Sequence, residues 1–585
     1  MDTLNLPLHA SEAEADIRQQ IAQHLAAAGV NVPGADLTLT DPPASDLGDF
    51  ALPCFAFAKE RKEPPAKLAA RIAAQPLPAG SNALIAAATA TGSYVNYTVN
   101  PATFGAAVLS EIARAGGNFG HAMLGAGKTV LVEYFSPNTN KPLTVGHLRN
   151  ICLGFSLSHL LQAFGFRVVE NSIYNDRGIA LCKAIVAYQR WGEGKTPADA
   201  GVKPDHFAGQ FYVRFNQAAA VDPALEEEAQ ACLQQWEAGD PSVRAIWRQL
   251  VDWTMDGFTQ TLTRVGVDHP AVRYFESEIY THGREIVEDG LARGIFQRHH
   301  EGYVYAPLEA HGLPDKILLR SDGTTLYITQ DLYLARLKAE HQPALSIYVV
   351  ASEQDLAFRQ LFKILELLGE SYPMVHRSYG MMRLPSGRIK SREGVPAGAG
   401  ADELLTMLDT MAAQEVRTRH AGLGDAAVAK RAQAIAISAL KYYILQVNAP
   451  SAMVFDPAKS LQFTGRTGPY LQYVHARCSS ILRKAGSMER RDGPVSFAEP
   501  AERPLLVQLS HFPRKLREAA VSLDPSVLAQ HLYDLAQAFS TFYQTVPVLA
   551  APEPARRSRL QMVAAVKTVM GRGLALLGIP AVEEM

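Results

Sequence analysis

Apolar and polar residues in the middle of the chain follow the pattern of a strand–helix–strand unit. The apolar run KTVLVEYF, residues 128–135, predicts a buried strand of a parallel sheet. In residues 147–164, apolar side chains recur at the spacing of one helical face and then of the opposite face, which predicts a helix packed on two sides. Gly165 ends this helix, and FRVVENSIY, residues 166–174, predicts the next strand. We therefore expect a Rossmann-type α/β unit.

The stretch before this unit has a different pattern. Residues 11–29 predict a helix with Ser11 as its cap and Gly29 as its stop, and residues 63–74 predict a second helix with prolines at its start. SYVNYTVN, residues 93–100, alternates and is rich in strand-forming residues. Together they predict a small α+β domain over residues 1–112, followed by a glycine-rich linker at 116–127.

The rest of the chain predicts two further domains. Residues 113–428 carry the α/β unit, with charged and tryptophan-rich helices inserted at about 190–300 and another buried strand, LSIYVVAS, at 345–352. Residues 429–585 are almost wholly helical in pattern. The expected fold class is multidomain α/β: a parallel-sheet catalytic domain, an α+β N-terminal domain and an all-α C-terminal domain. A length of 585 residues fits about three or four domains.

Composition and charge exclude several other classes. The five cysteines contain no CxxC pair, which argues against a structural zinc site and a disulfide framework and fits a reducing cytoplasm. The first residues lack a basic segment followed by an apolar run, and no run of about 18 apolar residues exists, so we expect no signal peptide and no membrane span. The net charge of −2 gives no electrostatic indication for the whole chain.

The opening of the predicted helix, KPLTVGHLRN at residues 141–150, is a candidate phosphate site. A helix start presents free backbone N–H groups and a partial positive charge. Gly146 removes a side chain, so that a flat base or ribose could lie against the backbone. His147 and Lys141 can donate to the same anion. A tight turn whose glycine only satisfies geometry is the alternative, and the ten residues alone do not decide between the two.

The longer stretch VEYFSPNTNKPLTVGHLRN resembles the nucleotide-binding signature of class I aminoacyl-tRNA synthetases, in particular of arginyl-tRNA synthetases. YNDRGIALCKAIVA, TTLYITQDL and YVVASEQDL are similar to later segments of that family's catalytic domain. FTGRTGPYLQYVHARCSSILRKAG is similar to the start of its helical anticodon-binding domain. The N-terminal stretch DLGDFALPCFAFAKE and the terminal GLALLGIPAVEEM also resemble the family, so the likeness covers nearly the whole chain.

The resemblance implies an activity and a set of site residues. Such enzymes join an amino acid to ATP, release pyrophosphate, and pass the acyl group to the terminal ribose of tRNA; Mg²⁺ accompanies the ATP. It implies catalytic roles for Lys141, Thr144, His147, Lys390 and Arg392. It implies ATP contacts from Gly146, Lys141, His147, Lys390 and Ser391, of which Lys390 and Ser391 lie with Arg392 in the basic loop LPSGRIKSREG at 384–394. Taken alone, that loop is better explained as a charged hairpin tip, but its place after the YVVAS strand and before the helical region favours the functional interpretation.

A guanidinium substrate needs carboxylates and neutral acceptors in fixed positions. The resemblance places Asp331 and Tyr327 at that end of the arginine, four residues apart and on one face if the segment is helical. It places Glu133, Asn138 and Gln354 around the α-amino group and neighbouring polar atoms. The alternatives are a surface acid for Asp331 and ordinary packing for Tyr327 and Gln354.

The C-terminal region has the charge expected of an RNA-facing domain. Residues 461–585 contain fifteen Lys and Arg against ten Asp and Glu, a net +5, which leaves −7 for the remainder. Tyr470, Tyr473, Phe542 and Tyr543 are candidates for stacking on unpaired bases, or else belong to the helix core. The resemblance thus implies a tRNA(Arg) partner for a cytoplasmic, monomeric enzyme, with a further tRNA-binding role for residues 1–112.

The chain departs from the family at two signatures. Thr144 stands where the family has a histidine, and Arg388 and Ile389 replace the expected lysine and methionine of the second loop. The chain is therefore a slow synthetase, or a paralogue that adenylates arginine or a guanidino analogue for a specialised role, or a non-catalytic tRNA- or arginine-binding regulator. The residues assigned to the arginine pocket favour the first two hypotheses over the third. The C-terminal domain favours the first hypothesis over the second.

Restoring the family's histidine tests the first departure. We predict that Thr144→His raises the rate of adenylate formation, by up to about 10²–10³-fold if the threonine hydroxyl donates nothing to the phosphates. The measurement is single-turnover formation of the adenylate with saturating arginine and ATP. An unchanged or lower rate would mean that the surroundings of Thr144 have been re-optimised.

Overall fold

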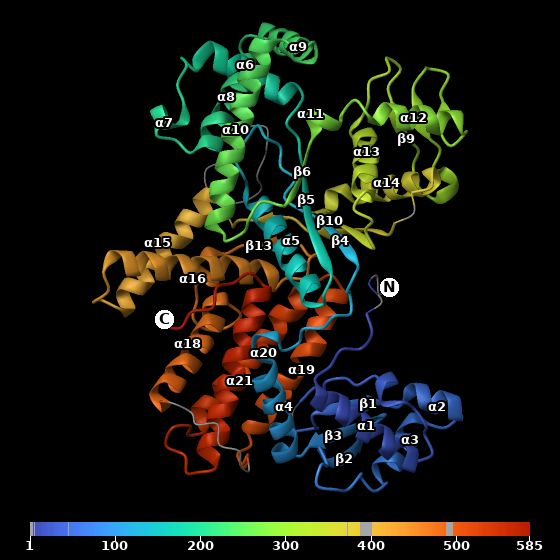
Figure 1. Cartoon of the computed structure of the whole chain (residues 1–585), viewed down its shortest axis with the longest axis vertical. Coiled ribbons are helices and arrows are strands. Elements are labelled where there is room, and N and C mark those ends of the chain that lie inside the picture. The colour runs from blue at the N-terminus through green and yellow to red at the C-terminus, as the bar shows by residue number, and fades with distance from the viewer. Residues whose placement is uncertain (1–3, 5, 45, 371, 386–399, 487–494) are drawn as a thin grey trace. The chain divides into compact units, whose positions relative to one another are not determined.

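The computed structural model describes the chain apart from residues 1–3, 5, 45, 371, 386–399 and 487–494. The chain forms two compact units (Figure 1). One consists of Met1–Leu124 together with Gln462–Met585, and the other of Gly125–Leu461. The two ends of the chain therefore build one unit, and the middle of the chain builds the other.

The unit Gly125–Leu461 contains a five-stranded sheet in which all neighbouring strands are parallel. The strand order is β11-β10-β4-β5-β6. The strands are β4 (Thr129–Glu133), β5 (Arg167–Tyr174), β6 (Val272–Phe275), β10 (Leu345–Ala351) and β11 (Met374–Tyr379). The order reverses at β4, which has β5 on one side and β10 on the other. In open parallel sheets, ligands bind outside the carboxyl ends of the strands at such a point.

Helix α5 (Val145–Ala163) follows β4 and is buried around most of its circumference, as its two-faced apolar pattern predicts. Gly154 lets it approach the end of the strand, because a Cβ there would lie 2.2 Å from Cγ of Tyr134. β4 ends before the apolar run does, since Phe135 adopts the left-handed conformation with φ of 57°. The predicted strand–helix–strand unit is otherwise confirmed.

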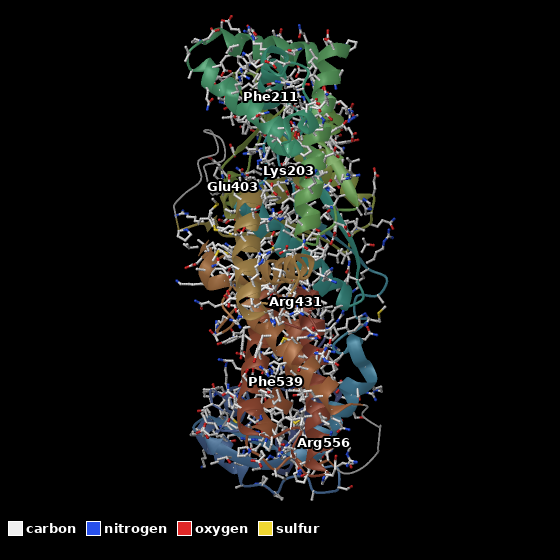
Figure 2. The ribbon with its side chains drawn as sticks, turned by 90° about the vertical axis from the view of Figure 1, so that its left-hand side faces the viewer. Lys203, Phe211, Glu403, Arg431, Phe539 and Arg556 are labelled. Carbon is white, nitrogen blue, oxygen red and sulfur yellow. The ribbon has the colours of Figure 1, made fainter. Side chains whose placement is uncertain are left out.

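A helical insertion lies between β5 and β6. It consists of α6 (Ile179–Trp191), α7 (Pro197–Ala200), α8 (Pro204–Ala219), α9 (Ala224–Glu237) and α10 (Pro241–Arg264). Phe211, Trp236 and Trp247 lie in its own hydrophobic core, and Phe211 is labelled in Figure 2. The predicted helices of residues 190–300 are confirmed up to Arg264. Beyond it the four-residue strand β6 interrupts the helices, because it takes its place in the central sheet and is too short to show a pattern. Helices α11 (Glu276–Ile279) and α12 (Gly283–Ala292) then follow, as predicted.

A second subdomain lies between β6 and β11. It consists of α11 (Glu276–Ile279), α12 (Gly283–Ala292), the small sheet of β7 (Gln297–Arg298), β8 (Val304–Ala306) and β9 (Lys316–Leu319), then α13 (Tyr327–Ala339) and α14 (Asp355–Leu368). Ile286, Leu332 and Ile364 belong to its buried core. The segment TTLYITQDL therefore enters a helix at Tyr327, which places Tyr327 and Asp331 on one face, as expected for residues four apart.

The end of this unit is tied to α5 by one arginine. After β12 (Met382–Arg383) come α15 (Ala401–Arg419), α16 (Asp425–Leu445), β13 (Met453–Val454) and α17 (Pro457–Ser460). Arg149 of α5 is fully buried and donates to three carbonyl oxygens, Gly380 at 2.6 Å, Ala449 at 3.0 Å and Ser451 at 2.8 Å. These bonds join α5 to two segments that lie more than 200 residues later in the chain.

The other unit combines an α+β part with a helical part. The α+β part holds α1 (Glu12–Ala27), α2 (Phe55–Arg61), α3 (Pro65–Ala73), α4 (Pro101–Ala115) and an antiparallel sheet of β1 (Phe50–Pro53), β3 (Tyr94–Val99) and β2 (Ile85–Thr91). Oγ of Ser11 accepts the N–H of Glu14 at 3.1 Å, so the predicted cap of the first helix is confirmed. The predicted second helix and the strand at 93–100 are confirmed as α3 and β3.

The helical part consists of α18 (Gly468–Ala485), α19 (Glu502–Val521), α20 (Ser526–Thr545) and α21 (Ala555–Leu576). Arg514 of α19 joins it to the α+β part of the same unit, with ion pairs to Asp41 at 2.7 Å and Glu14 at 3.3 Å. The multidomain α/β fold class predicted from the sequence is confirmed, with its parallel sheet, α+β N-terminal part and helical C-terminal part. Within the described ranges, no helix is both long and apolar enough to cross a membrane.

Arg149 should be required for folding of the catalytic unit. We predict that Arg149→Met lowers the free energy of unfolding by at least about 3 kcal/mol, because the carbonyl oxygens of Gly380, Ala449 and Ser451 lose their donor and the first two are buried. The measurement is urea unfolding, with the exposed Arg167→Met on β5 as control. Equal stabilities of the two variants would show that these bonds do not hold the segments to α5.

Candidate active site

The first turn of α5 is organised around Thr144 and His147. Thr144 is the residue before the helix and has an extended backbone. Its N–H donates to Nδ1 of His147 at 2.9 Å, and its Oγ1 lies 3.0 Å from the same nitrogen. Because Nδ1 accepts a backbone N–H, a neutral His147 carries its proton on Nε2. The imidazole is thus held by the turn itself and keeps one donor for a ligand.

The charge at this turn is set by burial. Burial, followed by the nearby Lys141, lowers the pKa of His147 to about 4, so the imidazole is neutral at pH 7. Burial also lowers the pKa of Lys141. A bound phosphate would therefore meet a neutral N–H donor, a desolvated amine and the backbone N–H groups at the start of α5.

Gly146 faces open space at the same turn. Among the described residues, a Cβ built on it would meet only Oγ1 of Thr144 within 4 Å, at 3.6 Å, and its φ is not one that requires glycine. Neither packing nor backbone strain therefore explains the glycine. Close approach of a ligand to the backbone stays our prediction for this residue without a side chain.

The segment before α5 is held from two sides. On one side, Gly209 of α8 approaches it so closely that a Cβ would lie 2.6 Å from Cδ of Pro142. On the other, the N–H of Ala401 at the start of α15 donates to the carbonyl of Leu143 at 3.0 Å, and Gly400 forms a β-bridge with Thr144. The helix start is therefore fixed by contacts from far along the chain.

Asn150 is a site residue that the sequence analysis missed. Its Oδ1 accepts the N–H of Phe135 at 2.5 Å, and its Nδ2 donates to the carbonyl of Val349 at 2.6 Å. It thereby fixes the carboxyl ends of β4 and β10, the two strands at the switch in strand order. The signal was the polar pair Arg149–Asn150 on a helix that is otherwise buried.

Asp331 lies one turn after the start of α13 and has an unusual environment. Burial, with repulsion from Glu133 as the next cause, raises its pKa to about 7, although Lys338 acts in the opposite direction. Among the described residues, no cation forms an ion pair with its carboxyl group. Tyr327 on the same face is 69% exposed. Such a carboxyl group is ready to ionise when a cation arrives.

Glu133, at the carboxyl end of β4, is buried and already has a cationic partner. Its Oε2 accepts from Nζ of Lys338, whose side chain is fully buried on α13. The ammonium group also lies 3.8 Å from the centre of the Tyr348 ring. Lys338 is a second residue that sequence analysis missed; its place seven residues after Asp331, on the same helical face, was the available signal.

The remaining predicted residues follow the ends of the two central strands. Asn138 is exposed and forms a β-bridge with Asn175, and Gln354 is exposed just before α14. Glu276, which the sequence analysis also missed, is buried and accepts amide N–H groups from Asn175 at 2.9 Å and Gln330 at 3.1 Å. These polar groups lie after parallel strands or beside Asp331, where the strand order places a ligand.

Part of the predicted site is not described by the structure. Lys390, Ser391 and Arg392, with the departures Arg388 and Ile389, lie outside the described residues. The described part of the prediction therefore consists of Glu133, Asn138, Lys141, Thr144, Gly146, His147, Tyr327, Asp331 and Gln354.

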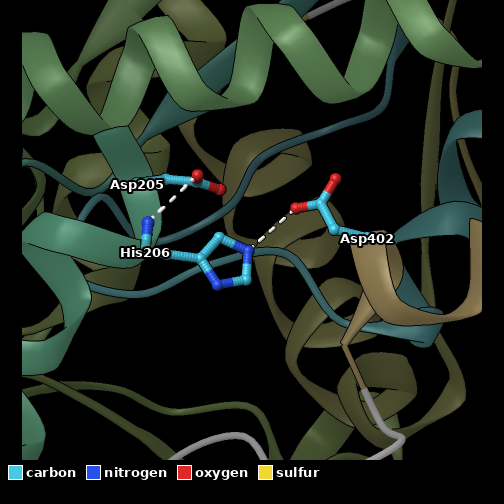
Figure 3. Close-up of side chains that lie close together, drawn as sticks. All are labelled: Asp205, His206 and Asp402. Carbon is cyan, nitrogen blue, oxygen red and sulfur yellow. Dashed lines mark hydrogen bonds and ion pairs between the residues drawn. The ribbon is translucent and has the colours of Figure 1, made fainter. Parts of the chain in front are cut away.

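Asp205, His206 and Asp402 form a second cluster, whose ligand-type atoms lie within 4.8 Å of one another (Figure 3). Nζ of Lys203 lies 2.7 Å from Asp402 and 3.3 Å from Asp205, so an ammonium group already compensates both carboxylates. The hydrogen bond to Asp402 raises the pKa of His206. This arrangement is an ion cluster that fastens α15 to α8, and the resident cation argues against a metal ion in the same place.

Comparison with known proteins agrees with this geometry. Residues 110–456 match the family of class I tRNA synthetases for arginine, described as "tRNA synthetases class I (R), catalytic domain". The protein is thus a class I aminoacyl-tRNA synthetase. Residues 471–585 match the DALR anticodon binding domain, and residues 15–99 match the arginyl tRNA synthetase N terminal domain. The chain belongs to the arginyl-tRNA synthetase family, and its activity is that of an arginine–tRNA ligase, which uses ATP.

Relatives and solved structures support the assignment over the whole length. The chain is 42% identical to an arginine–tRNA ligase of Treponema pallidum over 95% of this chain and 96% of the relative. It is 37% identical to one of Porphyromonas gingivalis, over 92% and 94%. An arginyl-tRNA synthetase structure from Thermus thermophilus superimposes with a TM-score of 0.80 at 28% identity, over 98% of this chain and all of that one. The family resemblance proposed from the sequence motifs is confirmed.

Gly146 offers a test of the open helix start. We predict that Gly146→Ala raises the KM for ATP about 10-fold or more, because the new methyl group displaces the nucleotide from the backbone. Its thermal stability should not fall, since the methyl group enters open space. The matched control is Gly154→Ala on the same helix, which should lower stability because its Cβ would overlap Tyr134. An unchanged KM would show that ATP does not approach this turn.

Proposed function

We propose that ATP binds against the start of α5 and that arginine binds with its guanidinium group on Asp331. The α-carboxylate of arginine attacks the α-phosphorus of ATP, and the bond to the pyrophosphate group breaks. The arginyl-adenylate is then attacked at its acyl carbon by a ribose hydroxyl at the 3′ end of tRNA(Arg). That hydroxyl gives up its proton, and AMP leaves with the electron pair of the acyl–oxygen bond.

The observation that carries this proposal is the state of Asp331. A half-buried carboxyl group whose pKa is raised to about 7 is costly to ionise alone and favourable to ionise beside a cation. The planar guanidinium group of arginine supplies that cation and donates in a fork that fits a carboxylate. Tyr327, one turn earlier and exposed, offers a hydroxyl oxygen to the same group.

The other roles follow from position. Glu133, Asn138 and Gln354 lie at or after the ends of β4 and β10 and face the α-amino end of the substrate. His147 donates Nε2–H, and Lys141 and the backbone of α5 donate beside it, to the phosphate oxygens on which charge develops. The protein contributes positioning and charge stabilisation rather than covalent chemistry. Thr144 supplies a hydroxyl in place of an imidazole at this turn.

We also propose how the tRNA is held. In the helical part of the unit formed by Met1–Leu124 and Gln462–Met585, Arg477 lies near two tyrosine rings. Its guanidinium carbon is 5.0 Å from the ring centre of Tyr473 and 5.2 Å from that of Tyr543. Tyr543 is 39% exposed, whereas Phe542 is fully buried and belongs to the core. A half-buried arginine beside one exposed tyrosine ring suits the bases of an unpaired loop.

The N-terminal part offers a second surface of this kind. Phe55 and Tyr94 are 50% and 38% exposed, and their rings meet edge to face at 5.6 Å. We assign the anticodon to the helical domain of residues 429–585, an additional tRNA contact to the α+β domain of residues 1–112, and catalysis to the domain of residues 113–428. These boundaries are those predicted from the sequence.

The conditions of the reaction complete the proposal. ATP is used as its Mg²⁺ complex, since phosphate groups in such sites carry this ion. We propose that the enzyme acts as a monomer, and the described residues assigned to arginine and ATP all lie in the unit Gly125–Leu461. It works in the cytoplasm, and its five cysteines are buried and free, as a reducing compartment requires.

Substitution of Asp331 tests the placement of arginine. We predict that Asp331→Asn raises the KM for arginine about 100-fold or more at pH 8, because the guanidinium loses its buried counter-charge. The measurement is arginine-dependent ATP–pyrophosphate exchange with tRNA present. The control is Asp289→Asn, a half-exposed aspartate of α12 paired with Arg293. An arginine KM unchanged by Asp331→Asn would move the guanidinium site elsewhere.

A further inference from the structure

Lys338 is a buried cation beside the proposed arginine site to which none of the roles above is assigned. It projects from the same face of α13 as Asp331, and its ammonium group donates to Oε2 of Glu133. Glu133 on β4 and Tyr348 on β10 are paired across neighbouring strands, and Lys338 contacts both. A lysine with a fully buried side chain is rare unless its charge is needed where it lies.

The charges around Asp331 come from several elements. Glu133 and Glu276 oppose its ionisation, and Lys338 and Lys316 favour it. Glu276 has compensation of its own, from two amide groups and from Arg177 at 4.0 Å. The other titratable groups nearby are Tyr348 of β10, Tyr372, whose hydroxyl donates to the carbonyl of Ala335, and Tyr274 of β6. Glu133 therefore depends on Lys338, and Asp331 has no ion-pair partner among the described residues.

We propose that Lys338 is a specificity-determining residue that sets the charge of the arginine site. Its direct ion pair compensates the charge of Glu133. The carboxyl group of Asp331 is then left to pair with the guanidinium group of one arginine. Lys338 acts through Glu133 and Asp331 and does not touch the substrate. The inference rests on the placement of arginine on Asp331 proposed above.

Removal of either partner should shift the pH at which arginine binds, in opposite directions. Without the ammonium group of Lys338, two carboxyl groups share one buried region, so protons are retained and arginine binding needs a higher pH. Without the carboxylate of Glu133, the ammonium group is uncompensated, so Asp331 ionises at a lower pH and the cationic substrate is repelled. Removal of both restores the balance of charge.

The experiment measures the KM for arginine in tRNA charging as a function of pH. We expect the midpoint of the wild-type profile near the pKa of Asp331, about 7, with a lower KM above it. Lys338→Met should raise this midpoint by about one pH unit or more, and Glu133→Gln should lower it. The double variant should return the midpoint towards that of the wild type, even where its KM is raised.

Controls separate this role from a purely structural one. Arg336→Met removes a cation from the same helix, one that pairs with Glu370 at the surface, and should leave the midpoint unchanged. Lys338→Arg keeps the charge and should also keep the midpoint. If Lys338→Met does not fold, because Glu133 is left buried and unpaired, two predictions still stand: Glu133→Gln lowers the midpoint and the double variant returns it towards that of the wild type.

Two results would overturn the inference. One is a midpoint that is the same in the wild type, Glu133→Gln and the double variant. The other is a double variant whose midpoint differs from that of the wild type as much as the midpoint of a single variant does. The placement of arginine itself fails differently, since Asp331→Asn would then leave the arginine KM unchanged whatever the behaviour of Lys338.

Discussion

The buried ion pair between Glu133 and Lys338 joins two parts of the catalytic unit, one formed by β4 and α5 and the other by α13. Glu133 ends β4, and the residues that follow it lead to the nucleotide-binding turn of α5. Lys338 belongs to α13, which carries Tyr327 and Asp331. Removing one partner of a buried pair costs about 3–5 kcal/mol, because the other charge is left without compensation. The pair therefore holds the strand of one part against the helix of the other, and it fixes the charge between them.

The two parts have opposite electrical character, which matches the two substrates. At the start of α5, a helix N-terminus, a neutral imidazole and a desolvated lysine surround the proposed place of the triphosphate. At α13, a carboxyl group whose pKa is raised to about 7 marks the proposed place of the guanidinium group. Two polar residues of α5 hold the surrounding segments in position. Asn150 bonds to the ends of both β4 and β10, and Arg149 bonds to the segments after β11.

Much of this arrangement could be predicted from the sequence, for local reasons. The period of apolar residues predicted β4, α5 and β5, and the i, i+4 spacing of Tyr327 and Asp331 placed both on one face of α13. The residues that were missed act over long distances in the chain. Lys338 pairs with a glutamate 205 residues away and Arg149 with a carbonyl 302 residues away, and no local pattern reveals such partners. β6 was missed because four residues carry too little periodicity.

The central claim is that the arginine site is short of one positive charge, which the substrate supplies as Asp331 ionises. The most direct measurement is the number of protons released when arginine binds, obtained by calorimetry in buffers of different ionisation enthalpy. The account predicts that nearly one proton is released at about pH 6 and close to none at about pH 8.5, because Asp331 is protonated in the free enzyme only at the lower pH. The same proton count at both values would contradict it.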